Sequence, residues 1–146
     1  IAMPAGAPFA LADDSADDGT DRDAAAYEFR GYRLDKSGTP TFLYRTGAID
    51  VEDQFMPAEK QTLRRQIRIV AADGQPEKRV VWFRANVGHS LKRNGIGSYT
   101  NDAGLTVTLE QGRLLDGRVQ KHEDVSEWIV PFDLSSETLI EVHYEW

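Results

Sequence analysis

The side chains best suited to acid–base or metal chemistry are three histidines, His89, His122 and His143. They lie far apart in the sequence, and none has a second histidine or a cysteine at the spacing of metal ligands. His143 alternates with Glu141 and Glu145, which predicts a solvated histidine among carboxylates on the outward face of a strand. We therefore predict no metal site. No paired general acid and base is marked out in the sequence either, so we predict no catalytic residues.

His89 has the most suggestive position of the three. It lies in ANVGHSLKRNGIG (Ala85–Gly97), in a loop flanked by glycine after a predicted central strand, and function concentrates in such loops. One interpretation makes His89 half of an acid–base pair in a sugar-active enzyme. The other is a loop histidine that only hydrogen-bonds its surroundings. Because the sequence offers no second half for the pair, the enzyme is the least favoured interpretation.

The acidic residues gather near the start of the chain, where residues 13–23 contain six aspartates. The stretch DDSADDGTDRDA resembles a calcium-binding EF-hand loop only loosely, since alanines stand at the third and twelfth positions when the loop is started at Asp14. We interpret residues 1–26 as an acidic N-terminal arm or linker, and leave weak calcium binding open. No nucleotide-binding glycine pattern and no serine-nucleophile elbow occurs.

The bulk composition excludes further classes of function. The net charge of −7 argues against nucleic-acid binding, which needs a clustered basic surface. The absence of cysteine excludes disulfides, thiolate metal sites and covalent c-type haem attachment in this chain. His89, Met3 and Met56 are not paired as haem ligands, so we predict no cofactor in this chain. No apolar run approaches the ~18 residues that a membrane span requires.

The elements that would position these residues are short β-like runs separated by turn signals. They predict an all-β fold, an antiparallel β-sandwich of about eight strands over residues 27–146. Pro57–Arg64 suggests one helical turn, and Asn94-Gly95 predicts a tight turn. The predicted strands are Tyr27–Leu34, Thr41–Val51, Leu63–Ala71, Arg79–Asn86, Leu105–Glu110, Arg113–Val119, Ser126–Leu134 and Thr138–Trp146.

The stretch YEFRGYRLDKSGTPTFLYR (Tyr27–Arg45) is predicted to form a β-hairpin around the turn DKSG. Strict alternation would place Tyr27, Phe29, Gly31 and Arg33 on one face and Glu28, Arg30, Tyr32 and Leu34 on the other. The rings could pair across the strands as ordinary packing. They could also form a platform for a sugar ring or a partner protein, for which the candidate binding residues are Tyr32, Tyr44, Trp82, Arg84 and His89.

The amino-acid sequence of this hairpin resembles that of a known protein family. The resemblance extends to the stretches PFALADD, LRRQIRI, VWFRANVG, WIVPFDL and IEVHYEW. The chain is similar to an uncharacterised β-rich region of large planctomycete-type exported proteins, over most of residues 8–146. The strongest match is Phe29–Tyr44, followed by Leu63–Arg65. In those proteins the region accompanies c-type haem domains and propellers similar to sugar or sorbosone dehydrogenases. The family offers no catalytic residues that can be transferred to this sequence.

This resemblance implies a non-catalytic accessory domain or subunit of an exported redox protein that oxidises sugars or alcohols. Its partners would be other protein chains or domains, some bearing haem c, in the periplasm or another extracytoplasmic compartment. This chain contains neither the haem-attachment motif nor a propeller, so the redox chemistry would lie elsewhere. The alternatives are a carbohydrate-binding β-sandwich module and, third, the sugar-active enzyme using His89.

Overall fold

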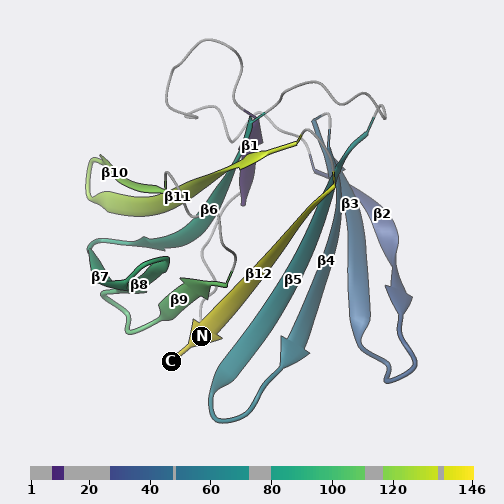
Figure 1. The fold of residues 1–146 in the computed structure, drawn as a ribbon, viewed down its shortest axis with the longest axis horizontal. Coiled ribbons are helices and arrows are strands. Elements are labelled where there is room, and N and C mark those ends of the chain that lie inside the picture. The colour runs from purple at the N-terminus through teal and green to yellow at the C-terminus, as the bar shows by residue number, and fades with distance from the viewer. Residues whose placement is uncertain (1–7, 12–26, 48, 73–79, 111–116, 135–136) are drawn as a thin grey trace.

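Every regular element in the described part of the chain is a β-strand. The computed structural model describes residues 8–11, 27–47, 49–72, 80–110, 117–134 and 137–146 (Figure 1). The strands are β1 (Phe9–Leu11), β2 (Tyr27–Leu34), β3 (Pro40–Thr46), β4 (Ile49–Pro57), β5 (Thr62–Ala71), β6 (Val80–Gly88), β7 (Leu91–Gly95), β8 (Ser98–Asn101), β9 (Thr106–Leu109), β10 (Arg118–His122), β11 (Val125–Asp133) and β12 (Thr138–Glu145). Among these residues no helix is long and apolar enough to cross a membrane. The predicted all-β class is confirmed, with more strands than expected.

The strands form two antiparallel sheets that pack as a sandwich. One has the order β1-β6-β11-β10, and the other has the order β2-β3-β4-β5-β12-β9-β8-β7. Rings meet between the layers, for example Tyr99 of β8 and Trp128 of β11, whose centroids lie 4.7 Å apart. Apolar side chains recur at every second position of the facing strands, because successive residues of a strand point to opposite faces. The core includes Ile49, Val51, Ile67, Ile69, Val81, Phe83, Val107, Val130, Ile140 and Val142.

Two local predictions around β4 are wrong. Thr41–Val51 is not one strand, because β3 ends at Thr46 and β4 begins at Ile49. The range Pro57–Arg64 contains no helical turn, because β4 ends at Pro57, β5 begins at Thr62 and residues 58–61 connect them. Lys60 and Gln61 there have φ angles of 54° and 60°, and such left-handed residues reverse the chain.

The segment after His89 is also more regular than expected. β7 and β8 form a hairpin whose turn lies at Ile96 and Gly97, with Gly97 at φ 67°. The predicted turn at Asn94-Gly95 is therefore displaced by two residues. This hairpin extends the larger sheet beyond β9 and leaves β7 as one of its edges, with β2 as the other.

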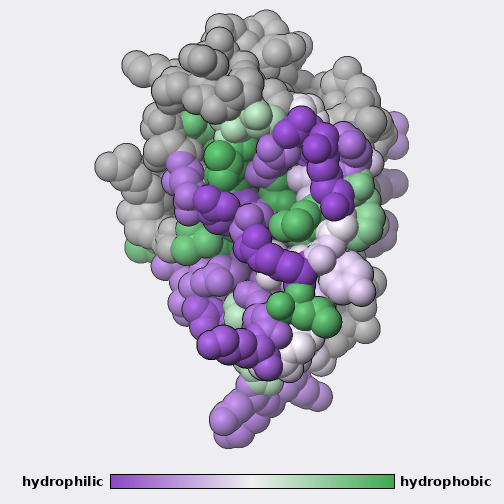
Figure 2. Space-filling model, turned by 90° about the vertical axis from the view of Figure 1, so that its right-hand side faces the viewer, coloured by the Kyte–Doolittle hydropathy of each residue, from purple (hydrophilic) through white to green (hydrophobic). Residues whose placement is uncertain are grey.

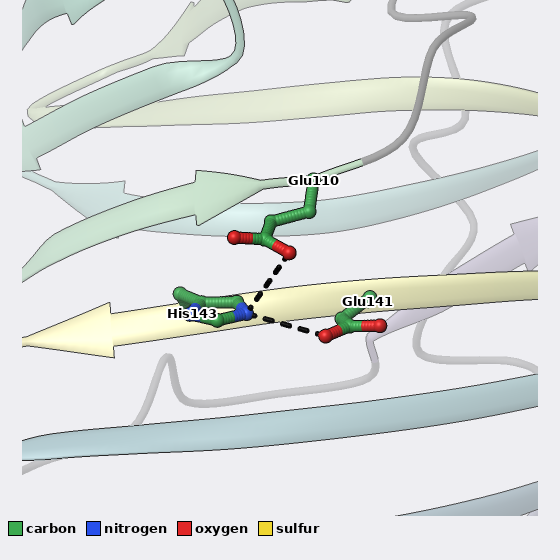
Figure 3. A group of neighbouring side chains, drawn as sticks. All are labelled: Glu110, Glu141 and His143. Carbon is green, nitrogen blue, oxygen red and sulfur yellow. Dashed lines mark hydrogen bonds and ion pairs between the residues drawn. The ribbon is translucent and has the colours of Figure 1, made fainter. Parts of the chain in front are cut away.

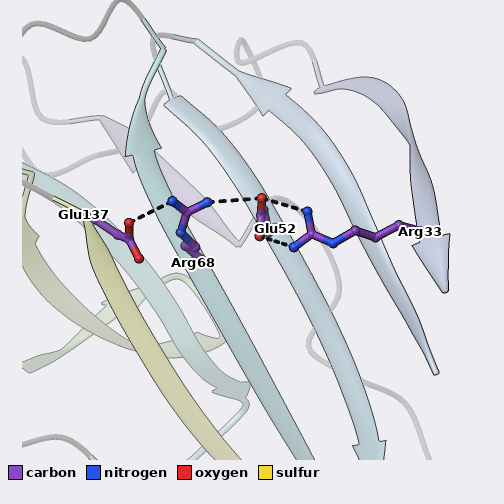
Figure 4. A network of polar contacts seen from close by, with 4 residues as sticks. All are labelled: Arg33, Glu52, Arg68 and Glu137. Carbon is purple, nitrogen blue, oxygen red and sulfur yellow. Dashed lines mark hydrogen bonds and ion pairs between the residues drawn. The ribbon is translucent and has the colours of Figure 1, made fainter. Parts of the chain in front are cut away.

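The outward face of the larger sheet carries charges of alternating sign (Figure 4). Glu52 of β4 accepts hydrogen bonds from Arg33 of β2 at 2.6 Å and from Arg68 of β5 at 3.1 Å. Arg68 also donates to Glu137, just before β12, at 2.7 Å. Exposed pairs of this kind contribute about 0–1 kcal/mol each. The outward face is thus polar and balanced in charge, in contrast to the inward face.

Candidate functional site

The described residues include an exposed apolar face on the hairpin β2–β3, called here the hairpin face. It consists of Tyr27, Phe29, Tyr32 and Leu34 of β2 and Phe42 of β3. Their exposed fractions are 39%, 64%, 62%, 59% and 37%, respectively. Such a group of large exposed apolar side chains marks interaction surfaces more often than isolated ones do.

The register of β2 on β3 explains why these side chains share a face. Phe29 lies opposite Tyr44 and Tyr32 lies opposite Phe42. Arg30 is an extra residue between these pairs and forms a β-bulge. The next residue, Gly31, has φ +116°, a conformation that glycine adopts readily and other residues adopt rarely. The bulge reverses the alternation along β2. The predicted placement of Tyr32 and Leu34 opposite to Tyr27 and Phe29 is therefore wrong.

The hairpin face lies on the inward side of the larger sheet, and most of it extends beyond the smaller sheet. Tyr27 still reaches that sheet, because its hydroxyl accepts a hydrogen bond from the Phe9 N–H of β1 at 3.3 Å. Phe42 pairs in register with Asp53, and Tyr44 pairs with Val51, whose side chain belongs to the core. Figure 1 shows β2 and β3 on the opposite side of the molecule from β6, β11 and β10. Figure 2 views that side and shows apolar patches between polar side chains. The same sheet face is thus core at β5 and β12 but solvent-exposed at β2.

A buried polar cluster borders the hairpin face on its inner side. Asp53 accepts two hydrogen bonds from Arg65, at 2.8 and 2.6 Å, and a third from the Tyr44 hydroxyl at 3.2 Å. Arg65 also donates to the Tyr144 hydroxyl at 3.3 Å, and its guanidinium lies 4.9 Å from the centre of the Phe55 ring. Arg65 is the charged residue that interrupts the apolar side of β5, and the cluster gives that charge its partners.

The electrostatics of this cluster favour a structural role. Burial raises the pKa of Tyr44, and the neighbouring negative charge of Asp53 raises it further. Burial likewise raises the pKa of Tyr144, although Arg65 opposes the shift. For Arg65, burial lowers the pKa, but the hydrogen bonds that it donates to Asp53 and Tyr144, and its electrostatic attraction to both groups, outweigh burial, so the pKa is raised and the guanidinium stays charged. With both Asp53 oxygens hydrogen-bonded, the cluster is built to hold charges in place rather than to exchange protons.

The structure does not bring the predicted binding residues onto one surface. Tyr32 and Tyr44 lie on the hairpin β2–β3, and only Tyr32 is exposed. Trp82 and Arg84 belong to β6 in the other sheet, where alternation turns them away from the side of the buried Phe83. The guanidinium of Arg118 covers the Trp82 ring at 5.0 Å from its centre. Arg84 forms an ion pair with Glu127 at 2.9 Å.

His89 lies in the connection between β6 and β7, in a loop held by Asp102. The Asp102 carboxylate accepts hydrogen bonds from the backbone N–H groups of His89 at 2.7 Å and Ser90 at 3.3 Å. These N–H groups lower the pKa of Asp102, with Ser90 contributing most. The imidazole Nδ1 contacts the backbone oxygen of Asp124 at 3.0 Å. Asp102 therefore orders the main chain of the loop, and a catalytic role for His89 stays the least favoured alternative.

A second polar cluster lies on the outward face of the larger sheet, where the sequence indicated only a solvated histidine (Figure 3). His143 Nε2 lies 3.4 Å from Glu141 Oε1 and 3.5 Å from Glu110 Oε2. Arg64 of β5 forms an ion pair with Glu141 and lowers its pKa. Alternation along β12 indicates that Glu141 and His143 share a face. Glu110 joins them only through the pairing of β9 with β12, which the sequence does not reveal.

The residues of the hairpin face that were not among the candidate binding residues are Tyr27, Phe29, Leu34 and Phe42. One signal for them exists, because a glycine inside a strand pattern, here Gly31, often marks a bulge. A comparison of the chain with known protein families finds no match, and a comparison with curated proteins finds none either. The family that the sequence motifs suggest therefore stays a prediction. The geometry of the hairpin face is the strongest indication of function.

Proposed function

We propose that this chain is a non-catalytic interaction module that binds a partner protein through the hairpin face. The observation that carries the proposal is the exposure of Phe29, Tyr32 and Leu34, each about 60% accessible on one side of a strand. A folded chain gains stability by covering such side chains, and aromatic residues are enriched at the centres of protein interfaces. The buried cluster beside them would hold the neighbouring strands rigid, which lowers the entropy lost on binding.

The proposed partner is a domain or chain of an exported redox protein, as the resemblance of Phe29–Tyr44 implies. This chain contains no cysteine, so a covalently attached haem c would lie on that partner. The module would then act by assembly in an extracytoplasmic compartment, while the oxidation of a sugar or alcohol takes place elsewhere in the complex.

The test is to purify the tagged full chain from cells that produce it natively, identify the chains that accompany it, and record the haem absorbance of the complex. Binding of the identified partner is then compared between the wild type, F29S/Y32S and E28S/R33S. The second variant alters the opposite face of the same strand and serves as the matched control. We expect F29S/Y32S to weaken binding at least about 30-fold, equivalent to ~2 kcal/mol, and the control to bind like the wild type.

Two results would contradict the proposal. The first is equal binding by F29S/Y32S and the wild type. The second is a chain that purifies under native conditions as a haem-free monomer with no partner. Because Phe29 and Tyr32 are exposed, their replacement should leave the free energy of unfolding within about 0.5 kcal/mol, which a urea titration checks.

A carbohydrate ligand is the second candidate, and the exposed ring of Tyr32 beside that of Phe42 favours it. These two residues lie opposite each other in the register of β2 and β3. Two neighbouring exposed rings, one with a hydroxyl group, offer an apolar surface and a hydrogen bond to a sugar. Calorimetry against a glycan panel distinguishes the candidates. Saturable binding that F29S/Y32S abolishes, without any protein partner, would favour the carbohydrate module.

A further inference from the structure

We propose that Glu110, Glu141 and His143 form a binding site for a divalent transition-metal ion of the zinc type on the outward face of the larger sheet (Figure 3). The site is independent of the hairpin face and of the proposed partner. It departs from the expectation of no metal site, because that expectation considered sequence spacing alone. The pairing of β9 with β12 supplies the third donor.

The distances between the donor atoms suit one shared ion. The Nε2 atom of His143 lies 3.4 Å from the nearest Glu141 oxygen and 3.5 Å from the nearest Glu110 oxygen. Tetrahedral zinc with bonds of about 2.0–2.2 Å places its ligand atoms roughly 3.3–3.6 Å apart. All three donor atoms lie within 4.8 Å of one another. A small rotation of the Glu110 side chain would therefore bring its oxygen to the distance from the Glu141 oxygen that two ligands of one ion require.

The types of donor determine which ions suit the site. One imidazole and two carboxylates, without a thiolate, match Zn²⁺ and the neighbouring first-row ions better than the hard ions Ca²⁺ and Mg²⁺, which take oxygen ligands only. The Glu110 side chain is 52% exposed and that of His143 is 36% exposed, so an ion can enter from solvent. Three protein ligands leave a fourth position open for water or for a donor from another molecule.

The backbone holds two of the three ligands in a fixed relation. Glu141 and His143 are two residues apart on β12 and point to the same face. The Glu110 N–H donates to the Glu141 carbonyl at 3.1 Å, which ties the third ligand to the same strand. Arg64 competes with a metal ion for Glu141, because its guanidinium pairs with the Glu141 oxygen that also contacts His143. An ion would share Glu141 through the second oxygen or displace Arg64.

The experiment is isothermal titration calorimetry of ZnCl₂ into the full-length chain without a histidine tag, in a non-chelating buffer with millimolar Mg²⁺. We expect one saturable site in the wild type. H143A and E110Q should each weaken that site at least about tenfold, since even changes beyond the direct ligands cost 10–100-fold. R64Q should strengthen it, because a neighbouring positive charge is removed.

Two matched controls separate a defined site from general attraction to acidic surface. E145Q removes a carboxylate from the same strand, and H122A removes an exposed histidine from β10; both should bind zinc like the wild type. The six aspartates of residues 13–23 are present in every variant, so the difference between wild type and H143A isolates the cluster. Equal binding by wild type and H143A, or no saturable zinc binding in the wild type, would overturn the proposal. Circular dichroism verifies that each variant is folded.

Discussion

Replacing Asp53 with asparagine tests how strongly the buried ion pair with Arg65 supports the fold. The two side chains are only 6% and 10% exposed. Asparagine keeps the shape of Asp53 but removes its charge, and the guanidinium of Arg65 cannot lose its own. Breaking a buried pair from one side costs about 3–5 kcal/mol, because the remaining charge is left uncompensated. For a domain of this size, that loss lowers Tm by roughly 10–20 °C.

The same strand offers a matched control in Asp50. Arg45 donates to both of its oxygens, at 2.7 and 2.8 Å, much as Arg65 does to Asp53. The difference is burial, since the Arg45 and Asp50 side chains are 33% and 43% exposed. Solvent screens an exposed pair, so D50N should cost only about 0–1 kcal/mol. Equilibrium urea unfolding measures both variants, with the fluorescence of the buried Trp128 among the signals.

The reasoning fails if D53N and D50N differ by less than about 1 kcal/mol, because burial would then not set the cost. A third variant, D53L/R65M, removes both charges together. It should be less destabilised than D53N, since no unpaired charge remains in the interior. A double variant as unstable as D53N would instead indicate that the lost hydrogen bonds, including those to the tyrosine hydroxyls, dominate.

Two further predictions concern pH and backbone packing. The pKa values of Tyr44 and Tyr144 are raised in the folded state above the ordinary value of 10.0, so their contribution is complete below about pH 10 and is lost as the pH rises above it. The free energy of unfolding should fall there by at most ~1.4 kcal/mol per pH unit for each phenol. Tyr44 and Tyr144 should ionise only when the chain unfolds. If all tyrosines of the folded chain titrate near pH 10, as followed by phenolate absorbance, the prediction is contradicted. G88A should destabilise the fold by about 1–3 kcal/mol, because its Cβ would lie 2.4 Å from the Asp102 carboxylate. G95A is the control, since its Cβ meets nothing within 4 Å, and equal urea midpoints for the two variants would refute the prediction.

The fold class was predictable because alternation reports directly on which face of a strand is buried. In β12 the sequence indicates that Ile140, Val142 and Tyr144 share a face, and all three are buried. The same holds for Val107 and Leu109 in β9. These strands are regular, so a period of two residues describes them completely.

The candidate sites were less predictable because they depend on irregularity and on pairing over long distances. Arg30 shifts the alternation of β2 by one residue, which a strictly periodic pattern cannot represent. Arg65 alternates in register with the apolar residues Leu63, Ile67 and Ile69, which marks it as a charge on an apolar face, but its partner Asp53 lies on another strand. Glu110 and His143 are 33 residues apart in the chain, and they come together only because β9 pairs with β12. Registers of this kind are set by the whole sheet.

The bulge in β2 also has a consequence for the edge of the larger sheet. A regular last strand offers a continuous row of free backbone groups, on which an extended segment of another chain can add. In β2, the extra residue Arg30 and the φ of +116° at Gly31 interrupt that row near its middle. Growth of the sheet past β2 is therefore obstructed, while its flat side stays accessible. The edge at β2 can therefore present Phe29 and Tyr32 to solvent without itself offering a continuous template for another strand.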